Sequence, residues 1–454
     1  MIDLFLVCIF CIFGVITGIA TGLLPGLHVN NISLILLSLS GVIVGSLTFL
    51  YQQGLTESFI LLLIAIFITS VSISHTFHDY IPSSFLGAPD ADTALSVLPA
   101  HTLLLKGKAY EGVFFSATGS LGAIFFCFLL LLPVRFVIGE PIYLYETIKD
   151  NMLWVLICIT IIMILTEKGK ITDFNLKGKK PYFLGMAFAA FLFFLSGIFG
   201  VVVFELTVDS PIGLQSPVLF PALTGLFGIS TLIHSLKNNP DIPTQSISEP
   251  NFDKKTKKSS IISVITGSLG GILVSIIPGI TSATGTVIAM NARGKTGGEN
   301  TDDSNKKQTI TTLSAVNTAC AFFVVVMLFV ILRPRSGAAI AAAELVSIEE
   351  WSSLLLPSNL SFLMIAVLLA GVLSYFSTLK TGIFFAKHFS KIPYQPLVIL
   401  TILFVTTLVF LFTGIVGLLV LLVATIIGLI PVLWGVRRSH CMGILLFPII
   451  LYFL

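Results

Sequence analysis

The sequence has 454 residues, of which 56% are hydrophobic and only 10% are charged, and its formal net charge is +3. A soluble chain carries about a quarter charged residues, so this composition excludes a water-soluble globular protein and predicts one that spans a lipid bilayer. The small net charge is spread over short loops and argues against nucleic-acid binding. The six cysteines stand singly, without the spacing of a disulfide framework or a metal site.

The N-terminal residues lack the basic stretch of a cleaved signal peptide, so we expect the first apolar run to be retained. Two apolar regions, 2–50 and 259–290, are interrupted by Gly and Pro and each predict a helix followed by a re-entrant arm. About ten further apolar runs are long enough, or nearly long enough, to cross a bilayer. They lie at 57–74, 112–134, 152–166, 182–205, 218–236, 309–332, 358–377, 394–412, 415–435 and 441–454.

Lys and Arg alternate between the loops in a way that orients these spans. Basic clusters occur around 106–108, 168–180, 254–258, 293–307, 380–391 and 437–438, whereas loops 139–151, 206–217 and 345–357 contain one Lys between them. Because basic loops remain on the cytoplasmic side, this pattern predicts a multi-pass protein of the cytoplasmic membrane.

The order of segments repeats. Each half has a broken segment, a span, a second segment rich in Pro, Gly and small residues, and about four more spans, and the charge pattern makes the halves enter the membrane from opposite sides. We therefore predict an all-α polytopic membrane protein with two inverted-topology repeats, each with re-entrant or broken-helix hairpins plus about five transmembrane helices. The repeats are 1–237 and 259–454, joined by a cytoplasmic linker, 238–258.

The first break in each half is a Pro-Gly pair followed by polar residues. Pro25 and Pro278 must end a helix, and the next half-helix begins with free N–H groups that suit an anion. Paired breaks in inverted halves indicate the binding site of a transporter. The alternative is that each Pro-Gly pair only kinks a helix. The expected substrate-binding residues here are Gly26, His28, Asn30, Asn31, Gly279, Thr281, Ser282 and Thr284.

The second break in each half carries charged residues. In the first half, Pro89 precedes Asp90, Asp92 and Thr93, which we expect to couple transport to Na⁺ or H⁺, although a loop with helix-capping aspartates is the alternative. In the second half, Pro334 precedes Arg335 and Ser336, which could bind a carboxylate or phosphate. An interfacial anchor at a helix end is the favoured interpretation of Arg335 and of the neighbouring Arg333.

Other polar residues lie within or next to spans. Asn317 needs a partner inside a membrane and is expected either to bind substrate or to join helices. The residue types of the motif containing His75, His78 and Asp79 weakly resemble those of a metal site, but a position at a hydrated membrane interface is the favoured interpretation. No cofactor or metal is expected beyond a coupling ion.

Five elements in chain order resemble the large membrane subunit (TctA type) of tripartite tricarboxylate transporters. They are Leu-Pro-Gly-Leu at 24–27, the segment 85–122, Ile-Pro-Gly at 277–279, Ala-Val-Asn-Thr-Ala at 315–319 and Pro-Arg-Ser-Gly at 334–337. Asp90, Thr318 and Arg335 differ from the residues usual in that family. The resemblance implies ion-gradient-driven uptake of an organic anion, with a small membrane subunit and an extracytoplasmic binding protein as partners.

A second function remains possible. The stretch 277–286 is also similar to an Ile-Pro-Gly-Val-Ser-Gly-Gly-Thr element of small bacterial polyprenyl-phosphate translocases, which implies a lipid phosphate held at the half-helix ends. A membrane enzyme is not expected, because the sequence has no His-Glu-x-x-His, no Gly-x-Ser-x-Gly and no phosphate loop. A homo-oligomer is possible.

Overall fold

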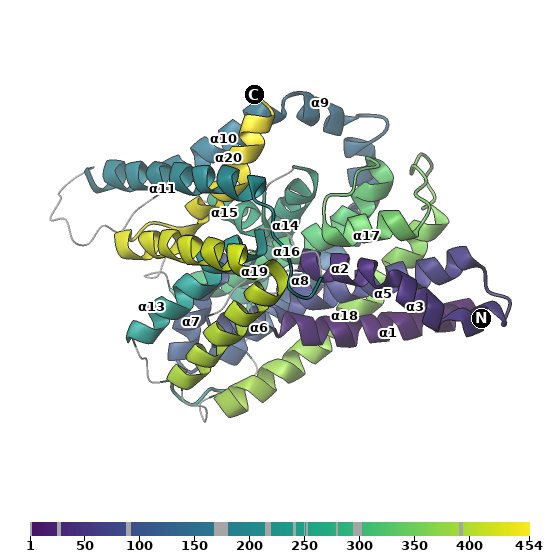
Figure 1. Ribbon diagram of the computed structural model, residues 1–454, viewed down its shortest axis with the longest axis horizontal. Coiled ribbons are helices and arrows are strands. Elements are labelled where there is room, and N and C mark those ends of the chain that lie inside the picture. The colour runs from purple at the N-terminus through teal and green to yellow at the C-terminus, as the bar shows by residue number, and fades with distance from the viewer. Residues whose placement is uncertain are drawn as a thin grey trace.

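The computed structural model describes residues 2–24, 29–87, 92–167, 180–213, 219–238, 242–248, 250, 253–277, 280–293, 302–389 and 394–454. Within these ranges the chain is helical and contains no strand, which confirms the all-α prediction (Figure 1). Eight helices there are long and apolar enough to cross a membrane, or nine if one bent pair is counted as a span. The multi-pass prediction is therefore confirmed.

The expected spans of the first half correspond closely to helices. The region 2–50, for which a helix followed by a re-entrant arm was expected, forms four helices, and the run 218–236 contains a π-helical turn, η2. The elements are α1 (Ile2–Gly22), α2 (Val29–Ser38), α3 (Ser40–Ser46), α4 (Thr48–Tyr51), α5 (Glu57–His78), α6 (Tyr80–Phe85), η1 (Ala94–Ser96), α7 (Val97–Leu105), α8 (Ala109–Ile138), α9 (Leu144–Asp150), α10 (Met152–Leu165), α11 (Lys180–Glu205), α12 (Leu219–Leu223), η2 (Thr224–Ile229) and α13 (Ser230–Asn238).

The second half has the same kinds of element. They are α14 (Lys254–Ile276), α15 (Ser282–Ala292), α16 (Asp303–Val330), α17 (Gly337–Leu345), α18 (Ser358–His388), α19 (Tyr394–Trp434), η4 (Arg438–Met442) and α20 (Gly443–Tyr452). At about 1.5 Å per residue, α19 is too long for one span of a bilayer about 30 Å thick. It is two helices that meet at a kink at Gly414, between the runs expected at 394–412 and 415–435.

Two helices form the centre of the molecule. In α5 with α6, 83% of the most apolar window is buried inside the protein, and in α16 the share is 89%, whereas the other candidate spans have 28–50%. A span surrounded by protein can carry polar side chains that a lipid-facing helix cannot. The long apolar side chains of the outer helices remain exposed, among them Leu129, Trp154 and Ile415. These outer side chains are the surface expected to face lipid.

Small residues allow each central helix to pack closely against the helix that precedes the break in its half. A Cβ atom at Gly18 would lie 2.5 Å from Ser74 Cβ in α5, and one at Gly271 would lie 2.6 Å from Ala319 Cβ in α16. Gly14 and Gly267 make equivalent contacts. Small residues at such spacing are typical of close helix pairs in membranes. The number of residues between Gly18 and Gly271, and between Gly14 and Gly267, equals the number between Pro25 and Pro278. The glycines therefore occupy corresponding positions in the two halves.

The contacts also define the directions of six long helices. Gly14 lies beside Ser70 and Gly22 beside His78, so α1 and α5 run in the same direction, and α18 follows them because Phe59 contacts Phe362 and His78 contacts Thr378. By the same reasoning α14 and α8 run in the direction of α16.

The two sets of three helices are antiparallel. Gly371 of α18 contacts Ile124 of α8, whereas Gly382 further along α18 contacts Val113 at an earlier position in α8. Helices α1, α5 and α8 therefore each run opposite to their counterparts α14, α16 and α18. These are the directions that an inverted repeat requires.

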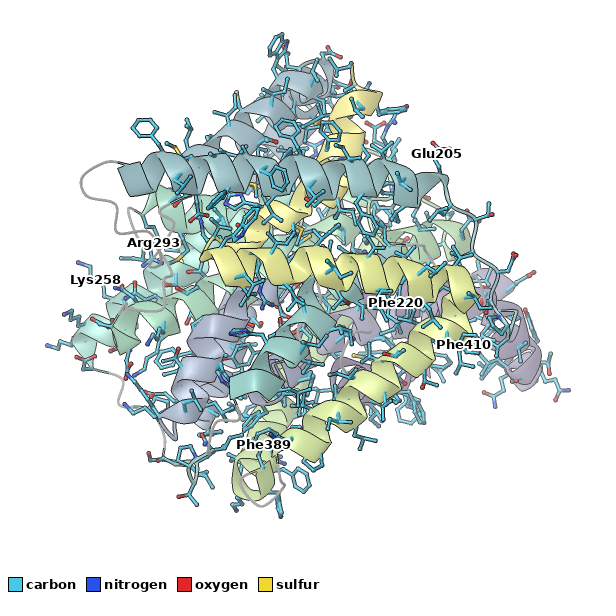
Figure 2. The ribbon with its side chains drawn as sticks, turned by 60° about the vertical axis from the view of Figure 1, so that its left-hand side comes forward. Glu205, Phe220, Lys258, Arg293, Phe389 and Phe410 are labelled. Atoms are coloured by element: carbon cyan, nitrogen blue, oxygen red, sulfur yellow. The ribbon has the colours of Figure 1, made fainter. Side chains whose placement is uncertain are left out.

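Residues from segments that were expected on opposite sides of the membrane lie towards opposite sides of the view in Figure 2. Figure 2 shows Lys258 and Arg293 near one another, with Glu205 towards the opposite side of the view. Lys258 and Arg293 belong to loops that the sequence places on the cytoplasmic side, and Glu205 precedes a loop expected outside. Which side of the membrane each segment faces stays a prediction.

Candidate functional site

Two hydrogen-bonded sets of polar side chains, brought together by the end of α5, lie where several broken helices meet. Together we call them the central polar cluster, which consists of Thr21, His75, Asp79, Asp92, Ser282 and Asn317. Its members come from the end of α1, the end of α5, the segment before η1, the start of α15 and the middle of α16. It therefore links the residues before the first Pro-Gly break to the residues after the second.

The start of α15 binds a carboxylate of the protein itself. Asp92 Oδ1 accepts a hydrogen bond of 3.0 Å from the backbone N–H of Ser282. Thr281 caps the same helix, because its Oγ1 accepts from the backbone N–H of Thr284 at 3.5 Å, and it also donates to Met442 Sδ. The free N–H groups and the positive end of the helix dipole explain why a negative group is stable there.

Asn317 connects this helix start to α5. Its Nδ2 donates to Asp79 Oδ2 at 2.9 Å, and its Oδ1 accepts from Ser282 Oγ at 3.3 Å. The amide is only 6% exposed, so both of its polar ends are satisfied by protein groups. Asn317 was expected either to bind substrate or to join helices. It does join helices, and it does so at the point where substrate binding is expected.

The interpretation of Asp79 as part of a wet interface was wrong. Asp79 is 6% exposed, and His75 and His78 are 1% and 0% exposed. His78 makes packing contacts, since its Nδ1 bonds to the Ser74 carbonyl and its Nε2 lies 3.2 Å from Thr378 Oγ1. His75 Nδ1 lies 3.3 Å from Thr21 Oγ1 and so connects α5 to the end of α1. Asp79 thus belongs to the candidate site.

Thr93 lies at the edge of the cluster. It is buried, and its Oγ1 is 2.8 Å from Ser83 Oγ, which in turn donates to the Asp79 carbonyl at 2.9 Å. Ser96 donates to the carbonyl of Thr93 at 2.7 Å. These bonds hold the segment that carries Asp92 against the end of α5.

A second helix start, that of α17, has a corresponding arrangement. Asn30 of α2 accepts a hydrogen bond of 2.9 Å from the backbone N–H of Gly337, and Ser336 Oγ accepts from Ala339 at 3.1 Å. A Cβ atom at Gly337 would overlap the backbone of Asn30, so glycine is needed for this approach. In both arrangements, a residue near the first break of one half bonds to a residue near the second break of the other half: Ser282 to Asp92, and Asn30 to Gly337.

Arg335 lies beside this second start. Its Nη2 donates to Tyr145 Oη at 2.8 Å, and its guanidinium lies over the Tyr145 ring. Its Nε and Nη1 are buried and have no hydrogen-bond partner in the described part of the chain. A buried donor without an acceptor is costly, so this guanidinium has capacity to bind an anion. Pro334 is exposed at the end of the preceding loop.

Several expected residues lie outside the described ranges. These are Pro25, Gly26, His28, Pro89, Asp90, Pro278 and Gly279, and for Asn31 only the helical backbone is described. Thr284 is described and fully buried, and its Oγ1 has no partner among the described residues. The roles given to all of these residues stay predictions.

The cluster places two carboxylates and an amide in a protein interior at membrane-spanning helices. Carboxylate oxygens there can bind Na⁺ or a proton, and the N–H groups at the helix starts can bind an anion. Sequence reasoning missed three members of the cluster, which are Thr21, His75 and Asp79. The signal for Asp79 was the density of hydroxyl side chains just before it, at 69, 70, 72, 74 and 76, because Ser and Thr are enriched where membrane helices pack against one another.

The comparisons with known proteins agree with this architecture. A profile of the "Tripartite tricarboxylate transporter TctA family" matches residues 8–443, nearly the whole chain. An uncharacterized protein of Methanocaldococcus jannaschii, MJ1079, is 29% identical over 451 residues, which cover 98% of each chain. No solved structure matches the chain. The match to the family extends beyond the motifs that suggested it, and the chain belongs to the tripartite tricarboxylate transporter TctA family.

Proposed function

We propose that the chain is the permease subunit of a secondary transporter, which moves an organic anion such as a carboxylate across the cytoplasmic membrane by alternating access. The family supports a transport component rather than an enzyme. The antiparallel directions of counterpart helices support two inverted repeats, 1–237 and 259–454, joined by 238–258. In such transporters the substrate binds near mid-membrane at broken helices.

The observation that carries the proposal is the hydrogen bond between Asp92 and the backbone of Ser282. The start of α15 already binds a carboxylate, so its N–H groups have the geometry and polarity that a substrate carboxylate needs. Substrate and Asp92 then compete for the same donor. A proton or Na⁺ on Asp92 would weaken its hydrogen bond with the Ser282 N–H and so favour the binding of substrate there. Ion binding would in this way be coupled to anion binding. Asp79 and Thr93 take part in the same ion site.

The test measures binding by the purified chain, because members of tripartite systems work with further subunits. Full-length protein in nanodiscs is titrated calorimetrically with mono-, di- and tricarboxylates at several pH values, with and without Na⁺. In Asp92→Asn the competing charge is lost, and since a hydrogen bond to a charged group contributes about 1.5–3 kcal/mol, we expect carboxylates to bind roughly tenfold more tightly or better.

Asn317→Leu should abolish carboxylate binding, because the amide that aligns α15 with α5 is lost. The matched control is Asp253→Asn. Asp253 also caps a helix, accepting from Thr256 N–H at 2.8 Å, but it lies on the exposed surface. This control should bind like the wild type. If no carboxylate binds to wild-type or Asp92→Asn protein under any condition, the carboxylate site is refuted.

A lipid-phosphate carrier is the second candidate function, because two donors of Arg335 have no partner among the described residues and suit a phosphate as well as a carboxylate. A short-chain polyprenyl phosphate that binds with higher affinity than any carboxylate would favour the carrier. Partner proteins are part of the first proposal: a small membrane subunit and an extracytoplasmic binding protein. Their co-purification with the tagged chain would test this.

A further inference from the structure

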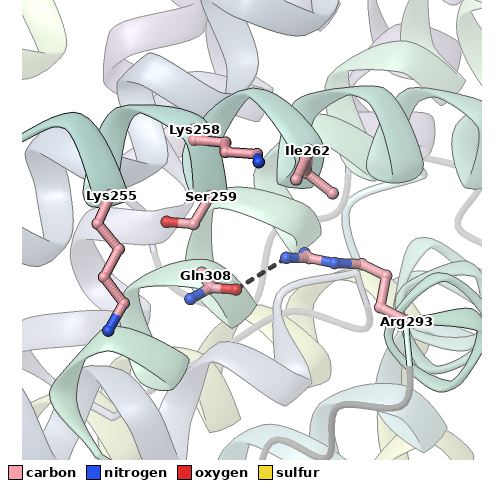
Figure 3. A pocket seen from close by; sticks show the side chains of 6 residues that line it. All are labelled: Lys255, Lys258, Ser259, Ile262, Arg293 and Gln308. Atoms are coloured by element: carbon pink, nitrogen blue, oxygen red, sulfur yellow. Dashed lines mark hydrogen bonds between the residues drawn. The ribbon is translucent and has the colours of Figure 1, made fainter.

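A pocket at the other end of α15 belongs to neither helix start described above. It is about 400 Å³ in volume and opens between the first turns of α14, the end of α15 and the first turns of α16. Figure 3 shows its lining side chains, which are Lys255, Lys258, Ser259, Ile262, Arg293 and Gln308. Ligand pockets have volumes of about 300–1,000 Å³, so the space suits a small group.

The fixed part of the pocket is the Arg293 guanidinium. Its Nη1 donates to Ser263 Oγ at 2.8 Å and to Thr312 Oγ1 at 3.4 Å, and its Nη2 donates to Gln308 Oε1 at 2.7 Å, drawn as a dashed line in Figure 3. These three acceptors are neutral, so they orient the cation without compensating its charge. Gln308 is itself held by a bond to Ser304.

The lysines on the rim form no salt bridge in the part of the chain that the structure describes. Within the described residues, Lys255, Lys258 and Arg293 form no ion pair, and no lining residue is acidic. Other basic residues nearby differ: Lys307 pairs with Glu111 at 2.5 Å, and Lys106 pairs with Asp303 at 2.6 Å.

The acidic residue closest in sequence does not fill the pocket. Asp253 caps α14, and its pKa is lowered first by its hydrogen bonds with Thr256 and to a smaller extent by the charge of Lys255. It is exposed and does not line the pocket. Among the described residues, the lining of this small space thus has three cations and no acidic side chain.

We propose that this pocket binds a phosphate group on the side of the basic loops. A fixed guanidinium and two mobile ammonium groups are the donors that phosphate prefers. Basic pockets between transmembrane helices near the cytoplasmic surface commonly bind the head groups of anionic lipids. The flank of α14 beside the pocket is apolar and exposed, at Ile261 and Ile262, where lipid tails could pack. A soluble phosphate compound would use the same donors.

The experiment follows thermal unfolding of the full chain in a mild detergent during titration with four probes. They are dihexanoyl phosphatidylglycerol, dihexanoyl phosphatidylcholine, glycerol 3-phosphate and inorganic phosphate. The proposal expects phosphatidylglycerol to raise the unfolding midpoint more than phosphatidylcholine if the source is lipid, and glycerol 3-phosphate or inorganic phosphate to act as strongly if the source is soluble.

Two double variants provide the control. Lys255→Gln with Lys258→Gln should lower the apparent affinity of the effective probe by about fivefold for each lysine. Lys254→Gln with Lys257→Gln removes the same charge from the same helix, but neither residue lines the pocket, and this variant should respond like the wild type. Arg293→Lys keeps the positive charge but loses the planar pair of guanidinium donors, and it should also weaken binding. The proposal is overturned if no phosphate probe shifts the midpoint, or if both double variants respond equally.

Discussion

The close contact between α14 and α16 makes a quantitative prediction for Gly271→Ala. A Cβ atom there would lie 2.6 Å from both Ala319 Cβ and the Val316 carbonyl oxygen, and 2.9 Å from the Cys320 nitrogen. Two of these atoms belong to the backbone, so the helices must separate. Overpacking of this kind costs about 1–3 kcal/mol, and the better helix propensity of Ala returns up to about 1 kcal/mol. We expect a net destabilisation of about 1–2 kcal/mol.

The assay is thermal unfolding of purified protein in one detergent, with the variants measured side by side. Gly18→Ala should be destabilised to a similar extent, because its Cβ would lie 2.7 Å from the Val71 carbonyl oxygen at the counterpart contact. Gly45→Ala is the matched control, since nothing lies within 4 Å of its Cβ, and it should be neutral or slightly stabilised. A midpoint for Gly271→Ala at or above that of Gly45→Ala would refute the packing argument.

Three further predictions concern other parts of the chain. Burial alone would raise the pKa of Glu167, but the hydrogen bond with His440 and the charge of Arg437 lower it to about 2 from an ordinary value of 4.5. The ionised Glu167 therefore stabilises the fold by roughly 3 kcal/mol above about pH 4.5, and this contribution is lost as the pH falls towards 2. The unfolding midpoints of wild type and Glu167→Gln should differ at pH 7 and converge in acid. Gly414→Ala should destabilise by about 2–3 kcal/mol in the same assay, because φ 61° and ψ −156° is a conformation essentially reserved for glycine; a stable variant would contradict the kink. Arg335→Gln should weaken the best anionic ligand about tenfold in calorimetry without lowering the unfolding midpoint, and unchanged affinity would remove Arg335 from the binding site.

Composition and hydrophobic run length were sufficient to predict the class of fold. Apolar runs have to be helical in lipid, because no water is present to satisfy the backbone, and so most spans could be placed from sequence, including the break at Gly414 within α19. The expected runs 218–236 and 441–454 form helices that are too short to count as spans, and α18 continues to His388, beyond its expected end at 377. The order of five short motifs was sufficient to predict the family. Local chemistry also predicted that a new half-helix begins after each Pro-Gly break, as α2 and α15 do.

What the sequence could not determine was which polar residues come together. Asp92 and Ser282 are 190 positions apart, and Asn317 and Asp79 are 238 apart, so no local pattern links them. Asp79 looked like an interfacial residue because it follows an apolar run, and its burial became evident only from the helices packed around α5. Side chains acquire their environment from packing between distant segments, whereas a helix is specified by neighbours along the chain. The spans were therefore determined by the sequence itself, and the site by the tertiary structure.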